Sequence, residues 1–196
     1  MKHVNVALFV PHAGCPHQCS FCNQKTISGS IKPLTPEDVT AACDIAKNGG
    51  VTRETSEIAF FGGSFTAVDR DYMVSLLEAA KPYIDGGYFG GIRISTRPDA
   101  IDDEKLEILK KYHVTSIELG AQSMDDSVLK INRRGHTAKD VENASHLIKS
   151  YGFSLGLQMM TGLPGDTDEK SLYTADEIIK LKPDIVRIYP TLTIKD

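Results

Sequence analysis

A regular alternation of apolar runs with amphipathic stretches constrains the fold of this chain more than any other feature. Each β-rich run precedes a segment whose apolar residues recur every three or four positions. The predicted strands cover Val4–Val10, Glu57–Phe61, Gly91–Ser95, Ser116–Leu119, Ser154–Met159 and Asp184–Tyr189. The predicted helices cover Pro36–Lys47, Asp69–Lys81, Asp102–Tyr112, Lys139–Ser150 and Thr167–Leu181. Strands that alternate with helices of this length predict a parallel sheet covered by helices.

Chain length favours one arrangement of these units. A closed eight-unit barrel needs roughly 250 residues, whereas this chain has 196 and six βα units. We therefore predict an α/β fold in one domain spanning residues 1–196, an incomplete (βα)6 TIM-like barrel of parallel strands; a doubly wound sheet is the alternative. The chain ends at Ile194-Lys195-Asp196, soon after the sixth predicted strand, so we expect a C-terminal part of a longer protein to be absent.

Charge and hydropathy bear on the location of the protein and on its partners. The net charge of −4 creates no positive field that would attract nucleic acid or acidic membranes. No apolar run approaches the ~20 residues of a membrane helix, and the N-terminus has no secretory pattern. We expect a cytoplasmic protein with no membrane partner, while the oligomeric state cannot be read from the sequence.

Three clustered cysteines carry the strongest chemical signal. Cys15, Cys19 and Cys22 form C-x3-C-x2-C directly after the first predicted strand, a spacing more typical of metal binding than of disulfides. Three thiolates can bind three irons of a [4Fe–4S] cluster and leave the fourth iron open to an external ligand, whereas an electron carrier normally closes every iron site with cysteine. Two alternatives remain: a non-enzymatic iron–sulfur module, and a zinc site completed by His12 or His17.

The segments that follow the strands are expected to meet at one site. They read PHAGCPHQCSFC, GGSF, TRPD, GAQS, TGLPG and PTL. In parallel α/β folds, ligands bind at the carboxyl ends of the strands. Glycine and proline are common in such loops, but cysteines are not. The fourth cysteine, Cys43, occupies an apolar helix position and is interpreted as a small buried hydrophobe.

With the aromatic Phe21 between the last two cysteines, the motif resembles that of the radical S-adenosylmethionine (SAM) superfamily. Further segments are similar to the radical SAM domain of the Elongator catalytic subunit and its bacterial relatives, and the broader pattern is similar to the oxygen-independent coproporphyrinogen oxidases. These segments are Ile94–Asp99, Glu118–Ser123, Asn132–Thr137 and Tyr189–Leu192. The resemblance implies an enzyme, oxidoreductase-like or RNA-modifying, in which a [4Fe–4S] cluster on the three cysteines cleaves SAM reductively. The resulting 5′-deoxyadenosyl radical would abstract hydrogen from a substrate.

The same resemblance implies which residues hold the methionine part of SAM. Gly62, Gly63 and Ser64 stand where the superfamily has a Gly-Gly-Glu-like segment that binds the amino group, with Ser64 in place of the acid. Arg134 stands where an arginine pairs with the carboxylate, and a guanidinium can bind a carboxylate through two hydrogen bonds. The alternative for Arg134 is a solvated basic turn.

The resemblance also implies residues for the nucleoside part of SAM. Ser95 falls at a position that meets the ribose, and Gln158 replaces an acidic residue at the ribose hydroxyls. Gln122 ends the fourth strand facing the SAM pocket, and Phe21 and Tyr189 would border the adenine. The alternatives are that the two glutamines satisfy loop backbone and that Tyr189 belongs to the core.

The implied partners are SAM, an external one-electron reductant of the flavodoxin or ferredoxin type, and a tRNA substrate by analogy with Elongator. A locally basic stretch, Lys130–Lys139, could form an RNA-binding rim, to which Lys25, Lys32 and Arg97 would add. The sequence also departs from both groups. The gap between its first two cysteines is shorter than in Elongator, and Gln24 stands where coproporphyrinogen oxidases have a further cysteine.

Overall fold

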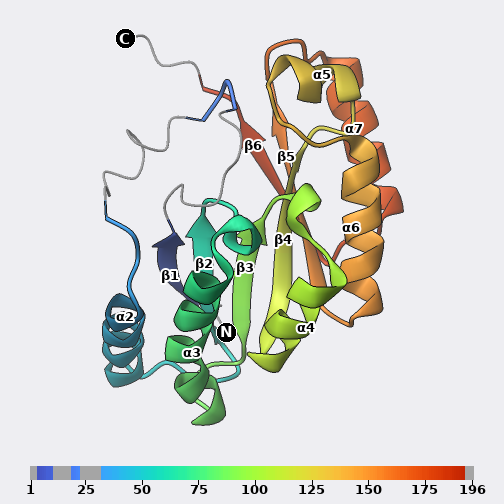
Figure 1. Ribbon diagram of the computed structural model, residues 1–196. Coiled ribbons are helices and arrows are strands. Elements are labelled where there is room, and N and C mark those ends of the chain that lie inside the picture. Colours follow the sequence, from blue (N-terminus) through green and yellow to red (C-terminus); the bar gives the residue numbers. More distant parts are fainter. Residues whose placement is uncertain (1–3, 11–18, 23–31, 193–196) are drawn as a thin grey trace.

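One parallel sheet organises the part of the chain that the computed structural model describes, residues 4–10, 19–22 and 32–192. Its six strands lie in sequential order, β1 to β6, and every neighbouring pair is parallel (Figure 1). The strands are β1 (Val4–Val10), β2 (Ser56–Gly62), β3 (Ile92–Thr96), β4 (Val114–Gln122), β5 (Ser154–Thr161) and β6 (Ile185–Pro190). The helices are α2 (Pro36–Asn48), α3 (Arg70–Asp85), α4 (Asp103–Lys111), α5 (Asp126–Ile131), α6 (Ala138–Ser150) and α7 (Asp168–Lys180), with short 3-10 turns at Phe65–Ala67 and Pro98–Ala100.

The sequential strand order confirms the predicted incomplete barrel. A doubly wound sheet reverses its strand order at a switch point, and no such reversal occurs along β1 to β6. The sheet instead curls into a half-barrel with the helices along its outer side (Figure 1). Helix α2 contacts β1, α4 contacts β4, α6 contacts β4 and β5, and α7 contacts β5. The carboxyl ends of all six strands therefore lie at one end of the half-barrel.

The two faces of the sheet carry opposite kinds of side chain. On the outer face, Ile58, Phe60, Ile117 and Leu119 are fully buried and form the core together with apolar residues of the helices. Burial of each such side chain contributes roughly 1.5–3 kcal/mol. Residues at alternate positions point into the half-barrel, and several of them are charged, with Glu118 fully buried among them.

Local sequence explains where the helices begin. Thr35 and Asp38 form a reciprocal capping box at the start of α2, and Thr137 and Asp140 do the same for α6. An N-cap side chain satisfies backbone N–H groups that have no partner within the helix. None of the helices in the described segments is both long and apolar enough to cross a bilayer.

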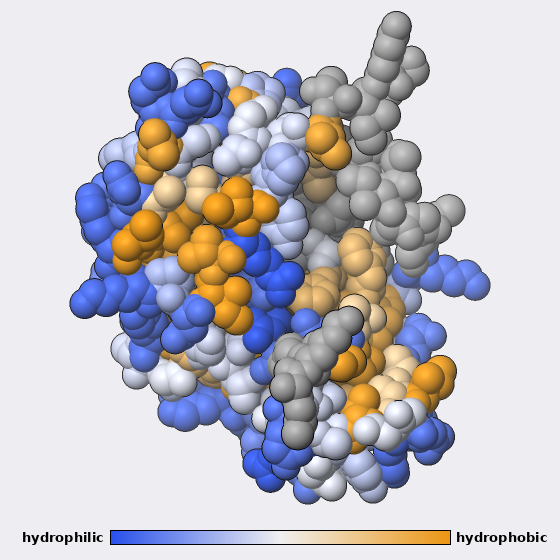
Figure 2. Space-filling model, turned by 180° about the vertical axis from the view of Figure 1, so that it is seen from behind, coloured by the Kyte–Doolittle hydropathy of each residue, from blue (hydrophilic) through white to orange (hydrophobic). Residues whose placement is uncertain are grey.

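The outer surface near the last strand carries several exposed apolar side chains. Figure 2, which views the molecule from behind, shows apolar side chains gathered on the side where α7 and β6 lie. Large apolar residues exposed on these two elements are Leu172, Tyr173, Ile179, Val186 and Ile188. Strand β6 thus lacks, within the described ranges, the helical cover that the outer faces of β4 and β5 have.

Candidate functional site

The cysteine segment packs against the loop that follows α5. The backbone N–H of Ser20 donates to the carbonyl of Asn132 at 3.2 Å, and the Ser20 hydroxyl donates to the Asn132 side-chain oxygen at 2.7 Å. A turn closed by the Cys22 N–H on the Cys19 carbonyl, at 3.1 Å, brings these two cysteines close together. The third predicted ligand, Cys15, lies outside the described residues.

Arg134 joins the cysteine segment to the sheet. Its Nη1 donates to Cys19 Sγ at 3.4 Å and its Nη2 donates to the carbonyl of Gly120 at 2.7 Å. Arg134 is 8% exposed, so it is a buried residue and not a solvated turn. In the described part of the chain its Nε makes no hydrogen bond. A buried N–H donor of this kind normally has a partner, so this atom is suited to an acceptor on a bound ligand.

The prediction that Arg97 extends the basic rim is wrong. The residue is 2% exposed, and its guanidinium donates through two nitrogens to Asp99, both at 2.9 Å. Its Nη2 also donates to the carbonyl of Arg134 at 2.8 Å. An arginine held by a bidentate carboxylate is strongly oriented. Arg97 therefore supports the backbone of Arg134 and takes no part in the molecular surface.

Gln122 is the last residue of β4, as predicted, and it lies beside Arg134, while its contact with SAM stays a prediction. Its backbone is left-handed, with φ of 66°, where the pairing with β5 shifts register. A Cβ atom on Gly120 would lie 2.7 Å from Arg134 Nη2 and 2.8 Å from Gln122 Nε2. Glycine at this position therefore lets the two polar side chains converge over the end of β4. Gln122 is 8% exposed, and within the described residues its Oε1 accepts no hydrogen bond.

The Gly-Gly-Ser segment is explained first by its packing against the ends of β1 and β3. Gly62 has φ of 110°, and a Cβ there would lie 2.7 Å from the Phe9 ring and from the Val10 carbonyl. Gly63 donates its N–H to that same carbonyl at 2.8 Å. The Ser64 hydroxyl is buried, 2.8 Å from the Thr96 hydroxyl, and accepts from the backbone N–H of Arg97 at 3.1 Å. Contact of this segment with a ligand amino group stays a prediction.

A cavity inside the half-barrel brings together four of the predicted ligand-binding residues. It has a volume of about 270 Å³. Its lining residues are Phe61, Gly62, Ser95, Glu118, Gln158, Arg187 and Tyr189. The hydroxyl of Ser95 is buried there and, among the residues described, has no hydrogen-bond partner. Tyr189 is 42% exposed, so it borders the cavity and does not belong to the core.

The floor of this cavity is an ion network that the sequence analysis did not identify. Glu118 accepts from Arg93 Nη1 at 3.0 Å, from Arg187 Nη2 at 2.8 Å and from Gln158 Nε2 at 2.9 Å. Arg93 also donates to Glu57 through two nitrogens at 3.0 and 2.8 Å. The sequence does contain a signal for Glu57, Arg93, Glu118 and Arg187, because each is a charged residue inside a largely apolar strand. Their pairing depends on strand register, which the sequence does not show.

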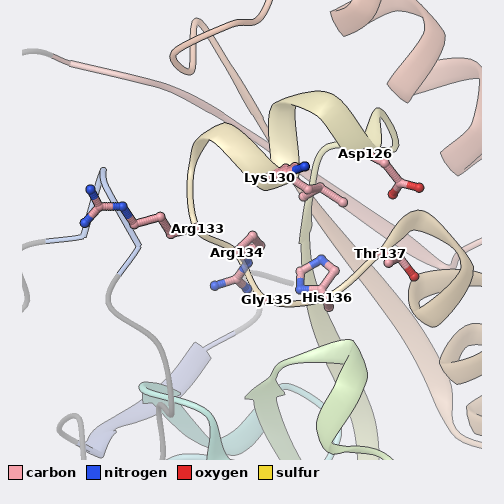
Figure 3. Close-up of a pocket in the computed structure, with 8 residues that line it drawn as sticks. Asp126, Lys130, Arg133, Arg134, Gly135, His136 and Thr137 are labelled. Carbon is pink, nitrogen blue, oxygen red and sulfur yellow. The ribbon is translucent and has the colours of Figure 1, made fainter.

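A second cavity, of about 470 Å³, lies between α5 and the loop that leads to α6 (Figure 3). Exposed Lys130 and Arg133 line it together with buried Arg134 and His136. His136 Nε2 lies 3.2 Å from the carbonyl of Ala121. Burial, and to a lesser extent the charge of Arg134, lower the pKa of His136 to about 4, so the ring is neutral at pH 7. Figure 3 shows Arg133 extending away from the His136 ring, toward the blue ribbon of the cysteine segment.

Two remaining cysteine-related predictions can be placed. Phe21 is partly buried within the turn of the cysteine segment. Cys43 is fully buried in the core, as predicted, and burial raises the pKa of its thiol to about 12. A thiol with so high a pKa is a poor metal ligand. Within the described ranges, no three histidine, cysteine or acidic side chains are grouped to hold a metal.

Comparison with known proteins places the chain among radical SAM proteins. A family model described as the radical SAM superfamily matches residues 9–178. A tRNA uridine(34) acetyltransferase of Dehalococcoides mccartyi is 25% identical over 97% of this chain and 49% of its own length. An oxygen-independent coproporphyrinogen-III oxidase-like protein, HemZ of Bacillus subtilis, is 26% identical over 97% of this chain and 40% of its own length. The chain thus spans about half or less of the length of these two relatives.

Solved structures show the same fold. The archaeal Methanocaldococcus infernus Elp3, with an N-terminal deletion, superposes with a TM-score of 0.72 at 22% identity, covering 100% of this chain and 47% of that one. Coproporphyrinogen III oxidase (HemN) from Escherichia coli, described as a radical SAM enzyme, superposes with a TM-score of 0.71 at 16% identity. That match covers 98% of this chain and 45% of the other.

Proposed function

The chain belongs to the radical SAM superfamily, and on that premise we propose that it binds a [4Fe–4S] cluster and cleaves SAM reductively. The superfamily generally uses this pair of cofactors. The observation that supports the proposal most directly is the contact of Arg134 with both Cys19 and the end of β4. It links the cysteine segment to the place where ligands bind in parallel α/β folds.

The residues present fit an iron–sulfur cluster. Cys15, Cys19 and Cys22 would supply three thiolates, and Arg134 donates to the sulfur of one of them. Hydrogen bonds to cluster sulfurs are a common means of tuning such centres. When bound and reduced, the cluster supplies the electron that splits the sulfonium of SAM and yields a radical able to abstract hydrogen. All other steps that the structure supports concern how this chain's residues hold SAM.

Two groups of residues would hold the two ends of SAM. At the end of β4, Arg134 Nε and Gln122 Oε1 are a buried donor and a buried acceptor without partners among the described residues, and they suit the carboxylate and amino groups of methionine. Inside the half-barrel, Ser95, Gln158 and Tyr189 line a cavity that suits a ribose and an adenine edge. We propose that SAM lies across both groups, with Phe21 and the Gly62–Ser64 segment at its margins.

The half-barrel would also protect the reaction from water. Below the cavity, the ion pairs of buried Arg93 with buried Glu118 and partly buried Glu57 occupy the lumen. A reactive radical needs a site from which water and side reactions are excluded. An electron donor of the flavodoxin or ferredoxin type would act from outside, on the side of the cysteine segment.

The substrate we propose is tRNA, by analogy with the Dehalococcoides mccartyi relative, whose name assigns it to tRNA uridine 34. Lys130 and Arg133 are exposed beside the cysteine segment, and no ion pair joins either of them to another described residue. Cations without partners next to a catalytic site suit the phosphates of a bound nucleic acid.

Production of 5′-deoxyadenosine tests the central proposal. Protein reconstituted without oxygen and reduced with dithionite should convert SAM to methionine and 5′-deoxyadenosine, measured by chromatography. Cys19→Ala should produce none, because one of the three irons loses its ligand, whereas Cys43→Ala should retain activity. A reduced cluster whose EPR signal does not change on addition of SAM would instead identify a non-enzymatic iron–sulfur module.

Binding of tRNA is tested separately, as a function of salt. We expect the affinity to fall with salt and the logarithmic slope to decrease by about 0.9 for each phosphate contact removed. The Lys130→Ala/Arg133→Ala double variant should lower both affinity and slope. Lys180→Ala, at the far end of α7, is the matched control and should lower neither. Absence of binding at low salt would contradict the tRNA proposal and leave SAM cleavage standing.

A further inference from the structure

Glu118 lies at the centre of the ion network in the lumen. It is fully buried on the inner face of β4 and accepts hydrogen bonds from two arginines and one amide. Two carboxylates, Glu57 and Glu118, face two guanidiniums, Arg93 and Arg187, so the four formal charges cancel. A buried carboxylate is tolerated when charged donors surround it in this way.

Glu118 also fixes the orientation of the Gln158 side chain. An ionised carboxylate only accepts hydrogen bonds. The amide of Gln158 must therefore turn its Nε2 toward Glu118, at 2.9 Å. Its carbonyl oxygen, Oε1, is left on the other side of the amide, and no hydrogen bond to it comes from any described residue. Because Gln158 lines the cavity, this oxygen is available to a ligand there.

The neighbouring strand is built to admit Glu118. Gly156 on β5 is paired with Glu118 in the sheet register. A Cβ atom on Gly156 would lie 2.7 Å from Cγ of Glu118, too close for any real contact. Any larger residue at this position would displace the glutamate. Glycine here is thus explained by the space that the Glu118 side chain needs, since its own backbone is in ordinary strand conformation.

We infer that Glu118 is a positioning residue that makes Gln158 present an oxygen acceptor to the cavity, where it selects a ligand that donates hydroxyl groups, such as the ribose of SAM. The inference rests on the proposed function. It explains how a glutamine can serve at a position where superfamily members have an acid. It also explains why the acid is absent, because a carboxylate at position 158 would face Glu118 at about the present 2.9 Å and the two charges would repel.

The test compares SAM with an analogue that lacks both ribose hydroxyls, by equilibrium dialysis with protein reconstituted without oxygen. We expect the wild type to bind SAM about tenfold or more tightly than the analogue, the effect of one or two hydrogen bonds. In Glu118→Gln, residue 118 can itself donate, so the amide of Gln158 is free to turn over. The preference should then fall to about two- or threefold.

A second pair of variants separates positioning from a merely structural role. Gln158→Glu alone should weaken SAM binding, because it opposes two carboxylates. Glu118→Gln/Gln158→Glu should restore the preference, since the amide introduced at position 118 then donates to the carboxylate introduced at position 158, whose other oxygen faces the ribose. Gly156→Ala, which displaces Glu118 without changing any charge, should reduce the preference as Glu118→Gln does, and it keeps the test open should Glu118→Gln fail to fold.

The outcomes distinguish this inference from the proposed function. If Glu118→Gln weakens both ligands equally and leaves their ratio unchanged, Glu118 is structural and the inference is overturned. The same holds if the wild type forms 5′-deoxyadenosine but does not discriminate between the two ligands. A wild type that binds neither ligand and forms no 5′-deoxyadenosine would overturn the proposed function and the inference together.

Discussion

The outer and inner faces of the same strands stabilise and specify the molecule in different ways. Leu119 and Glu118 are neighbours on β4, and both are fully buried, but they point to opposite sides of the sheet. Leu119 packs among apolar residues beneath the helices and needs no particular partner. Glu118 requires three donors in fixed positions. The apolar packing of the outer face therefore stabilises the fold and tolerates small shifts of side chains. The hydrogen bonds of the inner face fix the positions of polar side chains and do not tolerate such shifts.

The largest expected effect comes from the outer face. Leu119→Ala removes a fully buried side chain and should lower the free energy of unfolding by about 2–5 kcal/mol, measured by urea denaturation. The protein that remains folded should keep the wild-type ratio of affinities for SAM and its analogue without ribose hydroxyls. A changed ratio would show that the two faces are not independent.

The second largest expected effect is a loss of folding stability at low pH. It arises from His136, in the loop that follows α5. His136 bonds to the carbonyl of Ala121, an outer-face residue, and its pKa in the folded protein is about 4. In the unfolded chain a histidine has a pKa of about 6.5. The unfolded state therefore binds more protons between these values, and stability is lost as pH falls from about 6.5 to about 4, by up to about 3 kcal/mol.

Unfolding by urea at pH 7 and at pH 4.5 measures this loss. His136→Gln should lose less stability than the wild type over this interval, because it carries no group that must remain neutral. Exposed His146→Gln is the matched control and should lose as much as the wild type. Equal losses in all three proteins would mean that His136 is not held neutral by the fold.

Most of the architecture could be predicted because it depends on local patterns. The strand ranges agree with the structure to within a few residues, and the predicted incomplete barrel is confirmed. Strand β4 is longer than predicted, since it continues to Gln122 through an irregular pairing that Arg134 stabilises from a distant loop. Helix α5 was not predicted, because six residues are too few to show a helical period.

The candidate site was predictable where the family resemblance identifies single residues, and it was not predictable where contacts depend on the register between strands. Ser95, Gln158 and Tyr189 were identified by resemblance, and they do line one cavity. Arg93 and Glu118 lie 25 positions apart in sequence and meet only because β3 and β4 pair in one particular alignment. The sequence shows the charges but not the alignment.

A substitution on the inner face should reverse the pattern of Leu119→Ala. Gln158→Leu keeps a similar shape but removes the oxygen that faces the cavity. SAM binding should weaken about tenfold, or about 1.4 kcal/mol, while the free energy of unfolding should change by less than about 1 kcal/mol, since Glu118 keeps both arginines. A large loss of stability without loss of SAM binding would assign Gln158 to the structural network alone.

The smallest expected effect comes from the N-cap of helix α2. It tests whether destabilising an outer helix changes SAM binding inside the half-barrel. Thr35 caps α2, which packs on the outer side of β1, and its hydroxyl accepts from the Asp38 N–H at 3.3 Å. Thr35→Ala should lower the free energy of unfolding by about 1 kcal/mol.

Thr40→Ala is the control: it makes the same substitution inside the helix, where alanine is favoured, and should leave the free energy of unfolding unchanged. Neither variant should alter the affinity for SAM, because α2 contacts the sheet on the face opposite to the cavity. A loss of affinity in Thr35→Ala alone would mean that the start of α2 positions β1 and, through Phe9 and Gly62, the margin of the cavity itself.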